Sequence, residues 1–240
     1  MKGKELAHSV QGLYAAFAAY PLPKYTDPCL HCHSLDEEEK LRSQPLRELG
    51  LNELRDYAND ALLVWGDAQV FKHFLPRIYE LYVGLDDPSL EVCDPEIMFS
   101  KFRHGHWRTW PQPEQAAVES FLRAVWAEVL DGFTERGSYV DAESWLCAIG
   151  QSEDDLAPYF YQWEQDENQQ ACLALSALLL GSPVVLPGRQ ARNPFWDGRD
   201  AQYVQLQAWS KSSAVQEKLS RASDRWPDLE EFKAALTIVR

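Results

Sequence analysis

The segment PQPEQAAVESFLRAVWAEVL, residues 111–130, decides the fold class of this chain. Its apolar side chains recur at three- and four-residue intervals, the spacing that places side chains on one face of an α-helix. They are Val118, Phe121, Leu122, Val125, Trp126 and Val129. Pro111 and Pro113 precede them, and proline suits the first turn of a helix because the N–H it lacks would have no partner there. The segment predicts a long amphipathic helix.

The same spacing extends outward from this segment over most of the chain. It recurs at 6–17, 51–65, 71–82, 156–163, 171–180, 203–219 and 229–239. Only Pro183–Pro187 could form a short extended piece, and no linker rich in glycine, serine or proline divides the sequence. We therefore predict an all-α fold, an irregular array or orthogonal bundle of about eight to ten helices. We expect it to form a single domain over residues 1–240.

The charge balance limits the classes of partner. The 240 residues include 23 Lys and Arg against 37 Asp and Glu, a formal net charge of −14. Such a field repels nucleic acid and anionic membranes, and it suits a basic protein partner. The most apolar run, Ala171–Leu180, is roughly half as long as a bilayer span. Five cysteines without a signal peptide predict reduced thiols and a cytoplasmic protein.

The sharpest local pattern is CLHCH at residues 29–33. Cys29, Cys32 and either His31 or His33 could supply three zinc ligands, and His104 with His106 could complete a tetrahedral set. The pattern also matches the attachment motif of c-type haem, but that chemistry follows export. An inert cysteine pair in a proline-rich loop and a redox pair both remain open. Zinc is the one cofactor that the sequence suggests.

Cations alternate with aromatic residues in KFRHGHWRTW, residues 101–110. Such a run can stack on bases or hold phosphate. In a chain this acidic, a protein contact or an ion-paired turn is the favoured interpretation, and direct nucleic-acid binding is not expected.

Acidic residues gather in the second half of the chain. Carboxylates suit the first turn of a helix, and Ser152 to Asp155 resembles a capping box. They could also form a surface that meets a basic protein, where opposite charge speeds association. The residues predicted to bind a partner are Glu153, Asp154, Asp155, Glu164, Asp166, Glu167 and the aromatic Trp163.

Recognisable catalytic motifs are missing from the sequence. It has no phosphate-binding glycine loop, no nucleophile elbow and no zinc-protease motif. We therefore predict a protein that is not an enzyme. The enzyme alternative would use His73, His104 or His106 as its base, in a pocket that holds two of them and a carboxylate.

One block resembles an uncharacterised family of bacterial helical proteins. It consists of Trp65-Gly66-Asp67 and residues 71–77, FKHFLPR, after PLREL at 45–49. The chain is similar in character to immunity proteins that neutralise antibacterial toxins. This resemblance implies an inhibitor that occludes a basic toxin domain by direct contact. The alternatives are a helical adaptor or scaffold, with or without zinc, and an enzyme of unrecognised type.

Overall fold

The computed structural model describes residues 3–85, 91–132, 141–182 and 192–239. Within these ranges twelve α-helices and no strand are present, so the all-α prediction is confirmed, with slightly more helices than expected. The possible extended piece at Pro183–Pro187 falls outside the described residues. The contacts divide the chain into two compact units, Met1–Val125 and Trp126–Arg240, which are described separately below. The prediction of one domain over 1–240 stays a prediction.

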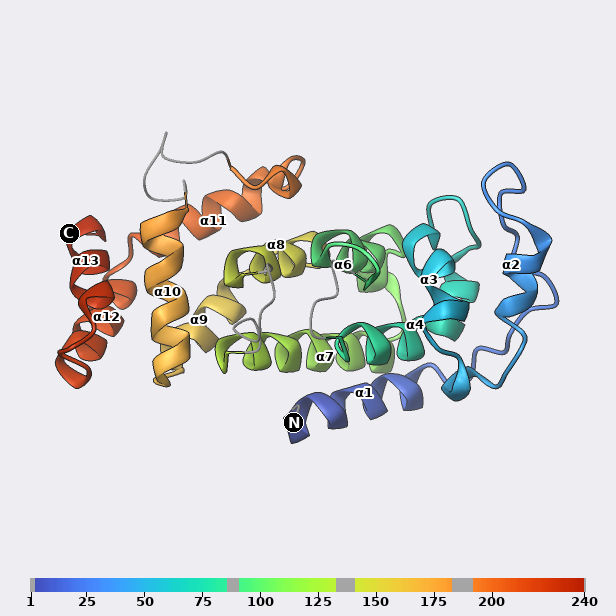
Figure 1. Cartoon of the computed structure of the whole chain (residues 1–240), viewed down its shortest axis with the longest axis horizontal. Coiled ribbons are helices and arrows are strands. Elements are labelled where there is room, and N and C mark those ends of the chain that lie inside the picture. Colours follow the sequence, from blue (N-terminus) through green and yellow to red (C-terminus); the bar gives the residue numbers. More distant parts are fainter. Residues whose placement is uncertain (1–2, 86–90, 133–140, 183–191, 240) are drawn as a thin grey trace. The chain divides into compact units, whose positions relative to one another are not determined.

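The first unit is built around the paired helices α1 and α4 (Figure 1). Its elements are α1 (Lys4–Ala16), α2 (Leu35–Lys40), η1 (Leu46–Glu48), α3 (Leu51–Asp60), α4 (Ala68–Tyr82), α6 (Pro95–His104), η2 (Trp107–Thr109) and most of α7 (Gln112–Leu130). Aromatic rings fill its core: Tyr79 stacks on Phe102 with centroids 4.6 Å apart, and its ring edge meets Phe99 at 5.7 Å. Such aromatic pairs stabilise the core by more than the burial of their apolar area alone.

The stripe predicted over 51–65 is longer than the helix that carries it. Helix α3 ends at Asp60, because the chain turns back through Leu62 and Gly66, which have positive φ angles of 65° and 70°. Trp65 is buried beyond that helix, and its indole N–H donates to the hydroxyl of Thr26 at 2.9 Å. The apolar spacing identified a buried residue correctly but assigned it to the wrong element.

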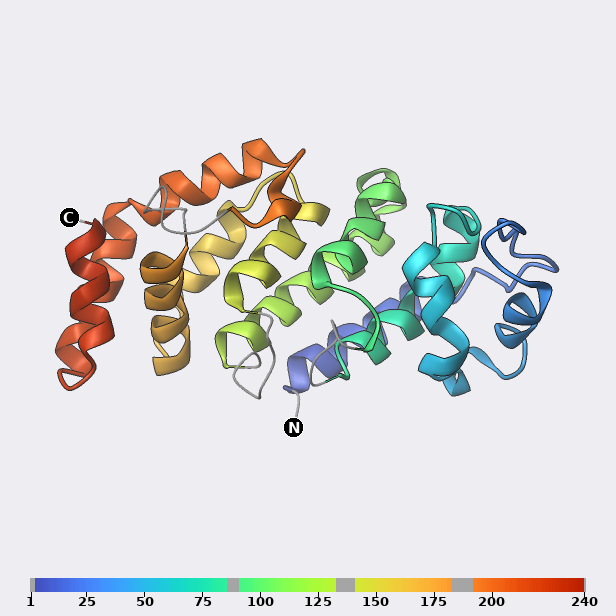
Figure 2. The same cartoon turned by 45° about the horizontal axis from the view of Figure 1, so that its top comes forward.

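The second unit contains α8 (Ala142–Ser152), α9 (Ala157–Gln165), α10 (Gln169–Gly181), η4 (Pro194–Trp196), α11 (Asp200–Ser210), α12 (Ser213–Arg225) and α13 (Glu230–Val239). Figure 2 shows α10 beside α12 and α13, the helices with which it shares its closest packing. Trp163 lies at the centre of an aromatic cluster, with ring centroids 5.2 Å from those of both Trp126 and Trp209.

Helix α8 approaches η4 closely because of a glycine. A Cβ atom at Gly150 would lie 2.8 Å from Cζ3 of Trp196, closer than side chains tolerate. Glycine costs about 1 kcal/mol in a helix interior, so its presence here reflects the need for space. This contact brings η4, and the start of α11 just after it, against the C-terminal end of α8.

Candidate functional site

The loop between α8 and α9 carries the acidic run Glu153-Asp154-Asp155. The predicted capping box at Ser152 is wrong, because α8 continues through Ser152 and α9 begins only at Ala157. Leu156 is the N-cap of α9, and Oδ1 of Asp155, just before it, accepts from the N–H of Ala157 at 2.9 Å. Helix α8 lies outside the predicted stripes, and its residues 145–149 are buried.

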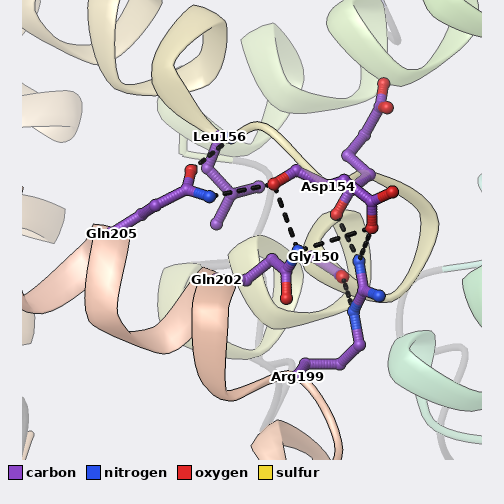
Figure 3. Close-up of polar contacts among 7 residues, drawn as sticks. Gly150, Asp154, Leu156, Arg199, Gln202 and Gln205 are labelled. Atoms are coloured by element: carbon purple, nitrogen blue, oxygen red, sulfur yellow. Dashed lines mark hydrogen bonds and ion pairs between the residues drawn. The ribbon is translucent and has the colours of Figure 1, made fainter.

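Three side chains from α11 and its N-cap hold this loop in place, and Figure 3 shows them converging on it. We call Arg199, Gln202 and Gln205 the clasp. The Arg199 guanidinium donates to the carbonyl oxygens of Gly150 and Glu153, at 2.7 and 2.5 Å, and to Oδ1 of Asp154 at 2.9 Å. Because Arg199 is buried, the two carbonyl oxygens are hydrogen-bonded by a charged guanidinium in place of water.

The two glutamines of the clasp complete the loop's hydrogen bonds. Both donate to the backbone carbonyl of Asp154, Gln202 at 3.1 Å and Gln205 at 2.9 Å (Figure 3). Gln205 also accepts from the N–H of Leu156 at 2.8 Å. The loop backbone is therefore fixed on both sides of Asp154.

The clasp leaves two carboxylates outside and one inside. The Asp154 side chain is 90% exposed, although it pairs with Arg199, and Asp155 is exposed too. Glu153 is only 4% exposed, and its carboxylate accepts from the Tyr159 hydroxyl at 3.0 Å. The expectation that Glu153 faces a partner is thereby corrected. Of the three acidic residues, Glu153 points into the core, and Asp154 and Asp155 lie on the surface.

The second predicted acidic group is more strongly tied to its own unit. Glu164 accepts from the Trp209 indole at 2.7 Å, and Asp166 accepts from the backbone N–H of Asn168 at 3.0 Å. Glu167 is exposed and pairs with Arg221 at 2.8 Å. These carboxylates are therefore bound by residues of their own unit, Glu164 and Glu167 by side chains of α11 and α12.

Trp163 is not a surface anchor, contrary to the prediction. It is 0% exposed, and its indole N–H donates to the carbonyl of Ala171 at 2.8 Å. Every tryptophan except Trp226 is buried, so these side chains serve the core. Among the described residues of this unit, the exposed large apolar ones are Tyr161 on α9 and Val204 on α11, which are 63% and 59% exposed.

The CLHCH segment forms a tight turn in the first unit. The N–H groups of Cys32 and His33 both donate to the carbonyl of Cys29 at 2.9 Å. His33 turns inward, with its ring 4.4 Å from that of Trp65 and its Nε2 3.1 Å from a carboxylate oxygen of Asp60. Backbone hydrogen bonding to His31 lowers the pKa of the Cys29 thiol, and the hydrogen bond with Cys29 raises that of Cys32.

Within the described part of the chain, no three His, Cys, Asp or Glu side chains are placed to hold a metal ion. Cys29, Cys32, His31 and His33 thus form no such set here, alone or with His104 and His106. The zinc site stays a prediction from the sequence.

The basic-aromatic run at 101–110 does not present its rings for stacking. Lys101, Trp107 and Trp110 are buried, and Arg108 pairs with Glu119. Of the three candidate catalytic histidines, His73 lines a pocket in the first unit. The enzyme alternative needed two of them in one pocket.

No protein-family model, curated protein or solved structure matches this chain. In addition, none of the described helices combines the length and apolar character needed to cross a membrane.

Sequence reasoning missed the clasp, although a signal for it was present. Arg199, Gln202 and Gln205 are three residues apart, so they share one face of a helix. Long polar side chains in such a row indicate that this face of the helix makes polar contacts with another segment of the chain. Nothing local, however, identifies the Gly150–Leu156 segment as its target.

Proposed function

We propose that this chain is a cytoplasmic, acidic protein-binding module that meets a basic partner through the α8–α9 loop, as an immunity-type inhibitor of a bacterial toxin would. The observation that carries this proposal is the pairing of a fixed backbone with exposed carboxylates at Asp154 and Asp155. A loop already held in one conformation loses little conformational entropy when it binds. That is the property expected of a recognition loop.

Charge and apolar contact would have separate roles at this surface. Carboxylates facing a basic cleft speed association and exclude partners of the wrong charge. Binding energy comes mainly from a few aromatic or apolar anchors that lose water on contact. Tyr161 and Val204 are the candidates for this role, because they are exposed on α9, which follows the loop, and on α11, which carries the clasp.

The test begins with the tagged chain at native expression level in its source cells, followed by identification of what copurifies. The proposal requires one basic protein in near-equal amount that is toxic when expressed alone. Recovery of the bare chain, or of an acidic or harmless protein, would contradict it.

Neutralising the loop should then slow association with that partner. We expect Asp154→Asn together with Asp155→Asn to lower the association rate constant roughly threefold to tenfold at low salt and to flatten its salt dependence. Asparagine keeps the acceptor oxygens that contact Arg199 and Ala157, so the loop should hold its conformation. Surface plasmon resonance over a salt series measures both quantities.

The matched control carries the same charge change at two other exposed acids, Asp224→Asn and Asp228→Asn. If the control slows association as much as the loop variant, only net charge matters and the loop is not the binding surface.

The zinc-stabilised adaptor remains the alternative, favoured by the turn that brings Cys29 and Cys32 together. It predicts about one zinc per chain after dialysis against buffer without chelator, and loss of that zinc in the Cys29→Ser, Cys32→Ser variant. Atomic absorption measures the metal. Less than a tenth of an equivalent in the unaltered chain excludes this alternative.

A further inference from the structure

A pocket of about 500 Å³ opens in the first unit between the end of α1, the η1 segment and α4. Binding sites for small molecules commonly have this volume and are lined mainly by apolar and aromatic side chains with a few polar groups. The lining here follows that composition. Tyr14, Phe17, Tyr20, Pro45, Leu46 and Pro76 form the apolar walls, and Arg47, Glu48 and His73 supply the charged or polar groups.

Two networks of polar contacts fix the walls. In the first, the Tyr20 hydroxyl donates to Glu114 at 2.6 Å and accepts from Lys72 at 3.0 Å, while Lys72 and Glu114 form a buried ion pair at 2.7 Å. In the second, the Tyr14 hydroxyl donates to Glu80 at 2.6 Å, and Arg77 binds both Glu80 and the carbonyl of Leu49, each at 2.7 Å. The pocket is therefore formed before any ligand arrives.

The hydrogen bond that His73 makes determines which of its ring nitrogens can accept. Its Nδ1 lies 2.8 Å from the carbonyl oxygen of Tyr20. A carbonyl oxygen only accepts, so Nδ1 carries the proton and Nε2 keeps its lone pair. Burial lowers the pKa of His73 and outweighs the hydrogen bond to Tyr20, which raises it; the nearby Arg42 adds to the lowering. The lowered pKa favours the neutral ring at pH 7. His73 thus gives the pocket a neutral acceptor.

The charges around the pocket mostly cancel in pairs. Lys72 with Glu114, Arg77 with Glu80 and Arg42 with Glu38 each form an ion pair at 2.7 Å. On the lining itself, Arg47 lies over the Tyr14 ring at 3.6 Å and donates only to the neutral amide of Gln11, at 3.2 Å. The exposed carboxylate of Glu48 is its neighbour. The pocket therefore offers one cation and two acceptors beside aromatic walls.

We propose that this pocket binds a small zwitterion with an aromatic side chain, of the aromatic amino-acid class. Arg47 binds the carboxylate, Glu48 and Nε2 of His73 accept from the ammonium group, and the ring lies against Tyr14, Phe17 and Tyr20. A ligand with only one charge would contact only one of the two charged side chains of the lining.

Three probes that share one ring test the assignment: L-phenylalanine, 2-phenylethylamine, which lacks the carboxylate, and 3-phenylpropanoate, which lacks the ammonium group. Isothermal titration calorimetry on the full chain should give saturable binding of L-phenylalanine. Each of the other two should bind about fivefold or more weakly, because a hydrogen-bonded charge is lost. No saturable binding of L-phenylalanine, or equal binding of all three, overturns the proposal.

Two variants then assign the contacts. Arg47→Gln should weaken L-phenylalanine and 3-phenylpropanoate about fivefold and leave 2-phenylethylamine unchanged, whereas Arg55→Gln, on an arginine outside this pocket, should change none of them. His73→Asn keeps a donor for the Tyr20 carbonyl but removes the Nε2 acceptor, so it should weaken only the two probes with an ammonium group. If Arg47→Gln weakens all three probes equally, the assigned carboxylate contact is wrong. The wild-type probe series decides the proposal even where a variant fails to fold.

Discussion

Replacing Arg199 with alanine is expected to lower the free energy of unfolding by about 3–5 kcal/mol. The substitution leaves the carbonyls of Gly150 and Glu153 without their donor, and each unpaired buried carbonyl costs about 1–3 kcal/mol. The buried stem of the side chain is lost as well. Urea denaturation followed by tryptophan fluorescence measures the change.

Arg221→Ala is the matched control, because it removes an exposed arginine from its pair with Glu167 in the same unit. Surface pairs of this kind contribute about 0–1 kcal/mol. A loss below about 1 kcal/mol for Arg199→Ala would mean that water replaces the guanidinium at the two carbonyls. The clasp would then not fix the acidic loop.

The second large loss of stability is expected when the buried ion pair between Lys72 and Glu114 in the first unit is broken. Lys72→Met should cost about 3–5 kcal/mol, because the Glu114 carboxylate would remain buried without its cation. The ammonium also lies over the rings of Tyr20 and Trp110, 4.8 and 4.5 Å from their centroids. Thermal and urea unfolding report the loss.

Removing both partners should cost less than removing one. We expect the double variant Lys72→Met, Glu114→Leu to recover much of the stability that Lys72→Met loses, because no buried charge remains without a partner. Glu119→Gln, at an exposed acid of α7, controls for the change in net charge and should stay within about 1 kcal/mol of the unaltered chain. Additive losses in the double variant would contradict this account.

Periodicity in the sequence identified most of the helices and much of the core, but α2, α6 and α8 lie outside the predicted stripes. Leu6, Val10, Leu13 and Phe17, predicted to share one face, are all buried along α1 and its C-cap. A pattern of this kind involves residues only a few positions apart, so it can be identified from the sequence alone. The same is true of α7, whose predicted apolar face is buried.

Roles that depend on distant segments could not be predicted in the same way. Trp163 was assigned to a surface, but Ala171 and Trp209 enclose it. Glu153 was grouped with its acidic neighbours, yet the helix that follows turns Tyr159 towards it. Neither the burial of a charge nor the target of Arg199 can be read from neighbours in the sequence, because both arise when separate helices pack.

The clasp also has a consequence for the order of events during synthesis. Arg199 contacts carbonyls that precede it by 46 and 49 residues, so the acidic loop cannot be closed until the chain has been made through η4 and beyond. Contacts of such large sequence separation form late, after local helices. A ribosome translates from the amino end, and the first unit is complete well before this point. The α8–α9 loop is therefore among the last parts of a newborn chain to be fixed. Under the proposed function, a partner could be bound only after the second unit has folded.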